Sequence, residues 1–198
     1  MSGTQVLYVK DRDTGDFVPV DGDFRWNALT TIDNAHRRVH LGQSFFGGHM
    51  WGDVSRIVDN GNADLLLRIG GTPMHVISHV AADGTCEVRY YEGVTVSADG
   101  TVAISANKNR LSSKTPDGGA LYYGPTVTDT GTELPPVLLP GGYSTGGGGG
   151  NVPAGGFNGS YDSEVIMKAN TDYLIRVTNR SNQAAAISIN VSGYGDFQ

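Results

Sequence analysis

The sequence predicts an all-β protein: an antiparallel β-sandwich, jelly-roll-like, with one long glycine-rich loop. Hydrophobic and polar residues alternate with a period of two in many short segments, whereas the helical period is hardly present. Turns that contain glycine separate these segments. About eight to ten short strands of this kind are expected of a sandwich or jelly roll. The length of 198 residues suits one core, so we expect residues 1–198 to form a single domain.

The first candidate strands lie in the N-terminal part of the chain. Residues 1–30, which contain "QVLYVKD" and "FVPV", are expected to form an N-terminal arm or strands, and "RVHLGQSFF" and "ADLLLRIGG" follow as further strands. In "RVHLGQSFF", Val39 and Leu41 alternate with Arg38 and His40. This segment is therefore predicted to be a strand that is entered through a turn at "IDNA".

Residues 74–106 are predicted to form a three-stranded meander. The segments "MHVISHVA", "CEVRYYEGVTVS" and "VAISAN" each alternate, and an "ADGT" sequence separates each from the next. Asp83-Gly84 and Asp99-Gly100 are dipeptides whose backbones accept positive φ, which favours tight hairpins between alternating strands.

A second hairpin is predicted near the C-terminus. The segment "DYLIRVTN" alternates, the polar turn "NRSNQ" follows, and "AISINVS" alternates again. The pattern is typical of a half-buried antiparallel pair. Its apolar rows are Tyr173, Ile175 and Val177, then Ile187, Ile189 and Val191.

Residues 135–160 depart from the strand pattern. Ten of the twenty residues from 141 to 160 are glycine, which loses more backbone entropy on ordering than any other residue. We predict a glycine-rich loop or arm that becomes ordered only on binding. Val137, Leu138 and Leu139 lie between prolines at its start, which favours docking on another surface. The run lacks the Gly-Lys-Ser/Thr ending of a phosphate-binding loop.

Composition argues against several classes of function. A charged fraction of 17%, a net charge of −6 and a pI near 5.2 argue against nucleic acid as a partner, because that needs clustered Lys and Arg. We expect no membrane span and no signal peptide, and synthesis in a reducing cytoplasm fits the single cysteine. The single cysteine, Cys86, forms no internal disulfide and is expected to pack within a strand.

Histidines occur twice at a spacing of four: His36 and His40, then His75 and His79. Zinc sites commonly use this spacing, because a helix then presents both imidazoles from one face. On the strands predicted here it separates them by about 13 Å, too far to share one ion. We expect no metal site. A mixed site made of one histidine from each strand and Asp33 or Asp53 is an open alternative that we do not favour. In the simpler interpretation the histidines hydrogen-bond or stack at the sheet surface or a subunit interface.

Catalytic chemistry is not indicated. A Gly-x-Ser-x-Gly nucleophile elbow is absent. Glu92, next to Tyr90 and Tyr91, is the most conspicuous acid, but an acid at a strand end beside tyrosines is ordinary. We expect neither an enzyme nor a cofactor.

Three segments in a shared order resemble a known family: "IDNAHRRVHLGQSFF", "YYEGVTVSADGTVAISANKNR" and "IMKANTDYLIRVTN". They are similar to segments of tailed-bacteriophage virion proteins that carry I-D-x-x-H-x-x-x-H-x-G-x-x-F, a Y-E-G hairpin running into N-x-N-R, and a K-x-N-T-x-Y-L strand. The resemblance covers about residues 31–191. It departs at the C-terminus, "GYGDFQ", where such proteins tend to end in aromatic-Tyr-Glu, and in the longer pentaglycine. The resemblance implies a capsid decoration or head-stabilising subunit without catalytic residues.

We therefore expect a structural virion protein on the capsid exterior, with the major capsid protein and further copies of itself, as a trimer, for partners. Tyrosines near the glycine-rich loop, Tyr122 and Tyr123 among them, favour a docking surface there. The alternative is a head-fibre or tail component that binds a receptor glycan, with Trp51 and tyrosines stacking on sugar rings; a carbohydrate-active enzyme is third. The candidate contact residues are Val137, Leu138, Leu139, Tyr143, Phe157 and Tyr161.

Overall fold

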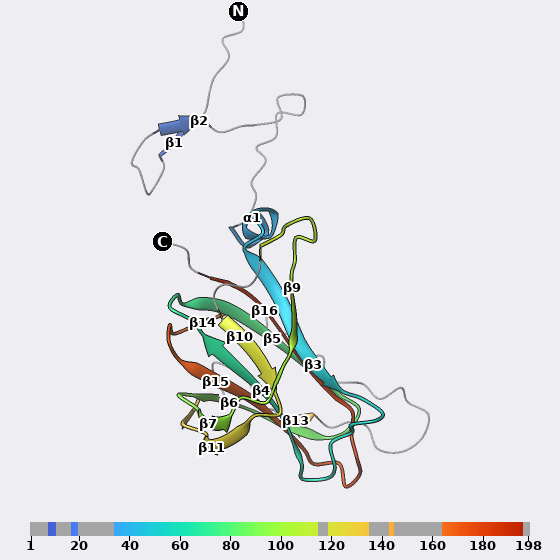
Figure 1. Ribbon diagram of the computed structural model, residues 1–198. Helices are drawn as coiled ribbons and strands as arrows, with labels where there is room; N and C mark the ends of the chain where they lie inside the picture. The colour runs from blue at the N-terminus through green and yellow to red at the C-terminus, as the bar shows by residue number, and fades with distance from the viewer. Residues whose placement is uncertain are drawn as a thin grey trace, which may run out of the picture. The chain divides into compact units, whose positions relative to one another are not determined.

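The computed structural model describes residues 8–10, 17–19, 34–114, 119–134, 143–144 and 164–195. The chain divides into two compact units, Met1–Arg37 and Arg38–Gln198. In the first unit, strands β1 (Tyr8–Lys10) and β2 (Phe17–Pro19) pair antiparallel (Figure 1). Both strands lie in segments that the sequence predicts to be strands.

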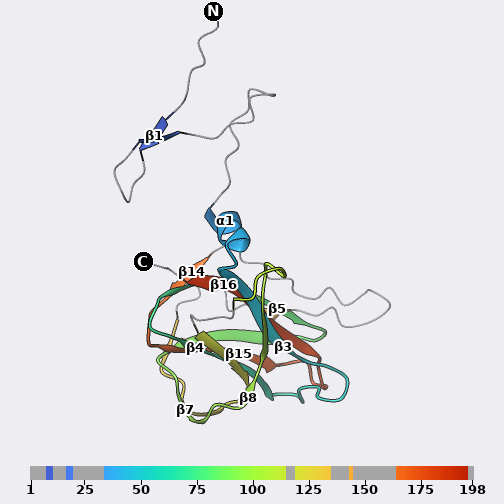
Figure 2. The same cartoon turned by 45° about the horizontal axis from the view of Figure 1, so that its top comes forward.

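The second unit is a sandwich of two antiparallel sheets (Figures 1 and 2). The predicted all-β fold class is therefore confirmed, and no helix in the described residues is long and apolar enough to cross a membrane. The five-stranded sheet has the order β14 (Val165–Met167), β5 (Met74–Ala82), β16 (Ile187–Gly195), β3 (Ser44–Trp51), β9 (Ile104–Asn107). The seven-stranded sheet has the order β12 (Thr132–Glu133), β6 (Cys86–Glu92), β15 (Asp172–Asn179), β4 (Asn62–Ile69), β10 (Gly119–Tyr123), β8 (Thr101–Val102), and β13 (Tyr143–Ser144) also pairs with β6.

The predicted meander over residues 74–106 is wrong, although its segments are strands. β5 pairs with β14 and β16, whereas β6 pairs with β12, β13 and β15. The turn at Asp83-Gly84 therefore carries the chain from one sheet to the other. The physical reason is the core. The inward side chains of β5 and β6, such as Val80 and Val88, belong to one buried cluster, because the apolar side of each sheet is buried against the other sheet.

The predicted C-terminal hairpin is wrong in the same way. β15 lies between β6 and β4 in the seven-stranded sheet, and β16 lies between β5 and β3 in the five-stranded sheet. Their apolar rows meet across the interior of the sandwich, where Ile175 and Ile189 are both completely buried. The polar turn "NRSNQ" thus connects two layers.

Strand β15 is also buried on its second face, so the half-buried prediction fails for it. Leu174 packs with Leu66, Tyr91 and Val94 in a second cluster on the outside of the seven-stranded sheet. Strands β7 (Thr95–Ala98) and β11 (Thr126–Asp129) form a separate antiparallel pair, from which Val96 and Val127 pack against this cluster. This pair buries one part of the seven-stranded sheet's outer side.

The segment predicted to be the strand "RVHLGQSFF" begins as a helix. Helix α1 (Asn34–His40) is followed by Gly42 at φ +66°, and β3 starts only at Ser44. The Gly42 N–H donates to Val39 O at 3.0 Å and the Gln43 N–H to Arg38 O at 2.9 Å. This pair of bonds is a Schellman motif, which needs a left-handed residue where the helix ends.

Candidate interaction surface and interior pocket

The contact residues that the sequence predicts fall mostly outside the described part of the chain. Tyr143 lies in β13, where its backbone pairs with Glu87 of β6. That the six predicted contact residues form a docking arm stays a prediction. The other five lie outside the described residues: Val137, Leu138, Leu139, Phe157 and Tyr161.

The described structure instead presents exposed apolar side chains, among Ser, Asn and His residues, on one side of the five-stranded sheet. We call the side that points away from the seven-stranded sheet the outer face. Residues opposite one another in antiparallel register share a side of the sheet, and the outward positions of the five strands carry no Lys, Arg, Asp or Glu. The apolar side chains most exposed there are Phe46 (48%), Met50 (65%), Ile104 (84%) and Ile166 (62%).

The outer side of the seven-stranded sheet, by contrast, carries several ion pairs. Arg176 donates two hydrogen bonds, of 2.8 and 2.7 Å, to the Asp64 carboxylate, which raises the pKa of Arg176. Glu87 accepts hydrogen bonds from Arg180 and Arg89, which lower the pKa of Glu87. A partner docking here would have to desolvate charges that are already paired. The further ion pairs of this side are Arg68–Asp99, Arg68–Asp172 and Arg89–Glu133.

A stacked row of side chains borders the outer face near helix α1. The Arg38 guanidinium lies 4.8 Å from the centre of the Tyr194 ring, and Tyr194 stacks on His75 with ring centres 4.7 Å apart. His75 Nδ1 lies 2.6 Å from a carboxylate oxygen of Glu164. The prediction that the histidines stack or pair at the sheet surface is confirmed for His75. The side chains at this margin thus contact one another within the chain.

The strand argument against a metal at His36 and His40 is wrong, because both lie in helix α1. A spacing of four on a helix puts them on one face. For His75 and His79, which do lie in β5, the strand spacing holds. Within the described ranges, no group of three or more His, Cys, Asp or Glu residues could hold a metal ion, and Asp33 lies outside them.

Glu92 has a structural role at the end of β6. It accepts hydrogen bonds from Lys168 Nζ at 2.7 Å and from the Tyr173 hydroxyl at 2.9 Å. These contacts, Lys168 first, lower the pKa of Glu92, and burial raises the pKa of Tyr173 to about 12. The carboxylate is thus an ionised and paired group.

The "NKNR" segment after β9 holds the end of helix α1. Asn107, which is buried, donates through Nδ2 to Gly42 O at 2.8 Å, and Asn109 donates to His40 O at 3.0 Å. Asn109 thus satisfies a helix carbonyl that has no partner within the helix, and Asn107 holds the glycine that follows the helix. The segments "AHRRVHLG" and "NKNR" therefore meet in the fold.

Trp51 is not available for stacking on a sugar ring. It is 8% exposed and meets His49 edge-on, with ring centres 4.7 Å apart. His49 stacks in turn on Tyr123 at 3.5 Å, and burial lowers the pKa of His49. The predicted glycan-stacking role of Trp51 is wrong.

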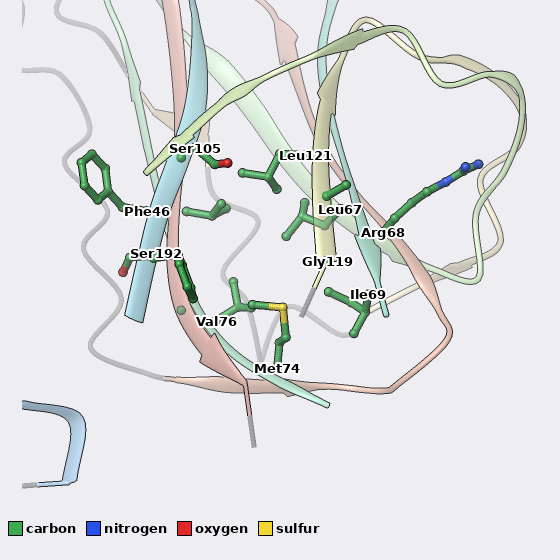
Figure 3. Close-up of a pocket in the computed structure, with 15 residues that line it drawn as sticks. Phe46, Leu67, Arg68, Ile69, Met74, Val76, Ser105, Gly119, Leu121 and Ser192 are labelled. Atoms are coloured by element: carbon green, nitrogen blue, oxygen red, sulfur yellow. The ribbon is translucent and has the colours of Figure 1, made fainter. Parts of the chain in front are cut away.

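An apolar pocket lies between the two sheets (Figure 3). It has a volume of about 60 Å³. Strands β3, β4, β5, β10 and β16 all contribute to its walls, and Arg68 extends away from it (Figure 3). The apolar side chains that line it include Phe45, Leu67, Ile69, Met74, Val76, Leu121 and Val191.

Sequence reasoning did not find the outer face or the pocket. In "SFFGGHMW", however, apolar residues occupy both alternating sets of positions, so Phe46 and Met50 stand where a half-buried strand would be polar. That local pattern was an available signal for the outer face. Comparisons with family models, with curated proteins and with solved structures found no match to this chain.

Proposed function

We propose that the chain is a structural virion protein, a decoration subunit that binds the outside of an icosahedral phage capsid and stabilises the shell. Two lines support this function: the three segments similar to virion proteins, and the outer face of the five-stranded sheet. The strand order adds support for a jelly roll, because β16 lies between β5 and β3 while β15 lies between β6 and β4.

The outer face is the single observation that carries the proposal. Phe46, Met50, Ile104 and Ile166 remain exposed on a sheet side without a carboxylate, ammonium or guanidinium at its outward positions. Phe46, Met50 and Ile104 lie on the neighbouring strands β3 and β9, and such a group of exposed apolar side chains is a frequent mark of a protein–protein contact. Burying it removes apolar area from water without desolvating a formal charge.

Such a subunit would stabilise the shell because the surface that it binds exists only in the assembled shell. A subunit that binds across neighbouring capsid proteins binds the assembled shell and not its dissociated parts, so mass action favours the shell. The expected partners are the major capsid protein and other copies of this chain, with a trimer favoured because capsid lattices have threefold junctions and homo-oligomers are usually closed.

Binding to undecorated capsids tests this function. Purified chain mixed with the shells should co-sediment with them and raise the temperature at which they disrupt. Ile104→Lys should weaken co-sedimentation by at least about tenfold, because an ammonium group would be desolvated in the contact. The matched control is Val54→Lys, since Val54 is fully exposed in the link between β3 and β4, outside the outer face.

Two results would count against the proposal. In the first, the wild-type chain neither co-sediments with shells nor changes their disruption temperature. In the second, Ile104→Lys and Val54→Lys bind as well as the wild type, which would exclude the outer face as the contact.

A further inference from the structure

Glycine occupies two inward positions of the five-stranded sheet in the wall of the pocket. Gly47 stands opposite Val191, and Gly193 stands opposite Phe45 and Val76, all of which are buried. A Cβ on Gly47 would lie 2.7 Å from Leu121 Cδ1, and a Cβ on Gly193 would collide with the His75 carbonyl oxygen. Neighbouring groups therefore approach so closely that neither position can carry a side chain unless these groups shift.

The chemistry of the walls is that of a hydrocarbon site. Aliphatic, thioether and aromatic side chains converge on the cavity, and the Arg68 guanidinium points away from it (Figure 3). Cavities with apolar walls tend to stay dry and to accept apolar molecules. A hydrocarbon group that entered would gain contact with wall atoms that otherwise face empty space.

The pocket is also reachable. Ser105, on the edge strand β9, is exposed, and Leu121 and Met74 are only half-buried. β9 and β10 belong to different sheets, so we expect a ligand to enter on this side of the sandwich, beyond the hydrogen bond from the Ala103 N–H to Leu121 O.

We propose that this pocket binds one compact hydrocarbon group of about four or five carbon atoms. A water molecule needs roughly 10–15 Å³ on this scale, so the cavity of about 60 Å³ admits a group the size of a leucine or isoleucine side chain. A free hydrocarbon or the side chain of a peptide can supply the group. The proposal is independent of the virion function.

Methyl-labelled full-length chain provides the test, with cyclopentane as the free hydrocarbon and N-acetyl-leucinamide as the peptide carrier. Cyclopentane should shift the methyl resonances of Leu67, Val76 and Val191 in a saturable manner and leave those of the exposed Leu111 unchanged. At about five times its Kd it should raise the Tm by roughly 2–4 °C. If N-acetyl-leucinamide shifts the same resonances, the site also accepts side chains of other chains; if it does not, the ligand is a free hydrocarbon.

Two variants that fill the pocket and one matched control test whether cyclopentane binds in the pocket. Leu121→Phe enlarges a side chain on β10, and Met74→Phe enlarges one on β5; each should weaken cyclopentane binding by at least about tenfold. Leu111→Phe makes the same change as Leu121→Phe at a side chain that is 98% exposed, and it should bind like the wild type. Absence of saturable shifts, shifts of equal size at Leu111, or undiminished binding by the folded filling variants would overturn the proposal.

Discussion

The Tyr173 hydroxyl donates a hydrogen bond of 2.9 Å to the Glu92 carboxylate and so joins the start of β15 to the end of β6. The same hydroxyl oxygen accepts the Lys168 N–H at 2.9 Å, and Lys168 Nζ binds Glu92 at 2.7 Å. Glu92, Lys168 and Tyr173 therefore form one closed network. This network holds the end of β6 and the start of β15 together.

Tyr173→Phe should lower the free energy of unfolding by about 1–2 kcal/mol. The change keeps the buried ring but leaves the Lys168 N–H without its acceptor and removes one of the two donors to Glu92. Urea unfolding measures the loss. Tyr122→Phe, at a half-buried ring on β10, is the control and should cost less; equal losses would mean that the network at Glu92 adds nothing.

Acid should destabilise the fold partly through Glu92. Its pKa is lowered in the folded chain, first by Lys168, so its contribution is complete above the ordinary glutamate pKa and is lost as the pH falls through the lower folded value. Between about pH 6 and pH 3, Glu92→Gln should therefore lose less unfolding free energy than the wild type. Asp53→Asn, at a side chain that is 98% exposed, should behave like the wild type. The prediction fails if Glu92→Gln and the wild type show the same pH dependence.

Leu174→Ala should cost about 2–5 kcal/mol, the range for truncating a buried leucine. Leu174 is completely buried in the cluster beneath the β7–β11 pair. Chemical denaturation of this variant beside Leu111→Ala, at a highly exposed leucine, measures the difference. A cost below about 0.5 kcal/mol would show that the outside of β15 is open to solvent.

Cys86 should resist thiol reagents in the native protein. It is 1% exposed, and burial, aided by Asp83, raises its pKa to about 11, whereas the thiolate is the reactive form. Labelling with a disulfide reagent near pH 8 should be slow in buffer and fast in urea. Rapid labelling without denaturant would place the thiol at the surface.

The sequence predicted strands better than it predicted their partners. Alternation located β5, β6, β15 and β16, because a strand with one side in the core must alternate. Pairing was wrong because Asp83-Gly84 allows a reversal of the chain without deciding whether the next strand enters the same sheet. That choice depends on which apolar rows cover each other, as Ile175 and Ile189 do, and this is a property of the whole core.

The helix and the candidate surface show two further limits. Val39 and Leu41 alternate with polar neighbours by coincidence over only a few residues, while Gly42 carried the stronger signal of a helix end. Phe46 and Met50 could have indicated an exposed apolar strand side. Ile104 and Ile166 could not, because their common sheet forms only through β3, β16 and β5, which lie between them.

Electron cryo-microscopy of virions that contain this protein tests the central claim most directly, because it locates the chain and its contacts together. The account predicts density for the sandwich on the capsid exterior, with the outer face that carries Phe46, Met50 and Ile104 packed against a neighbouring subunit. A sandwich located elsewhere in the virion, or one whose outer face points to solvent, would contradict it.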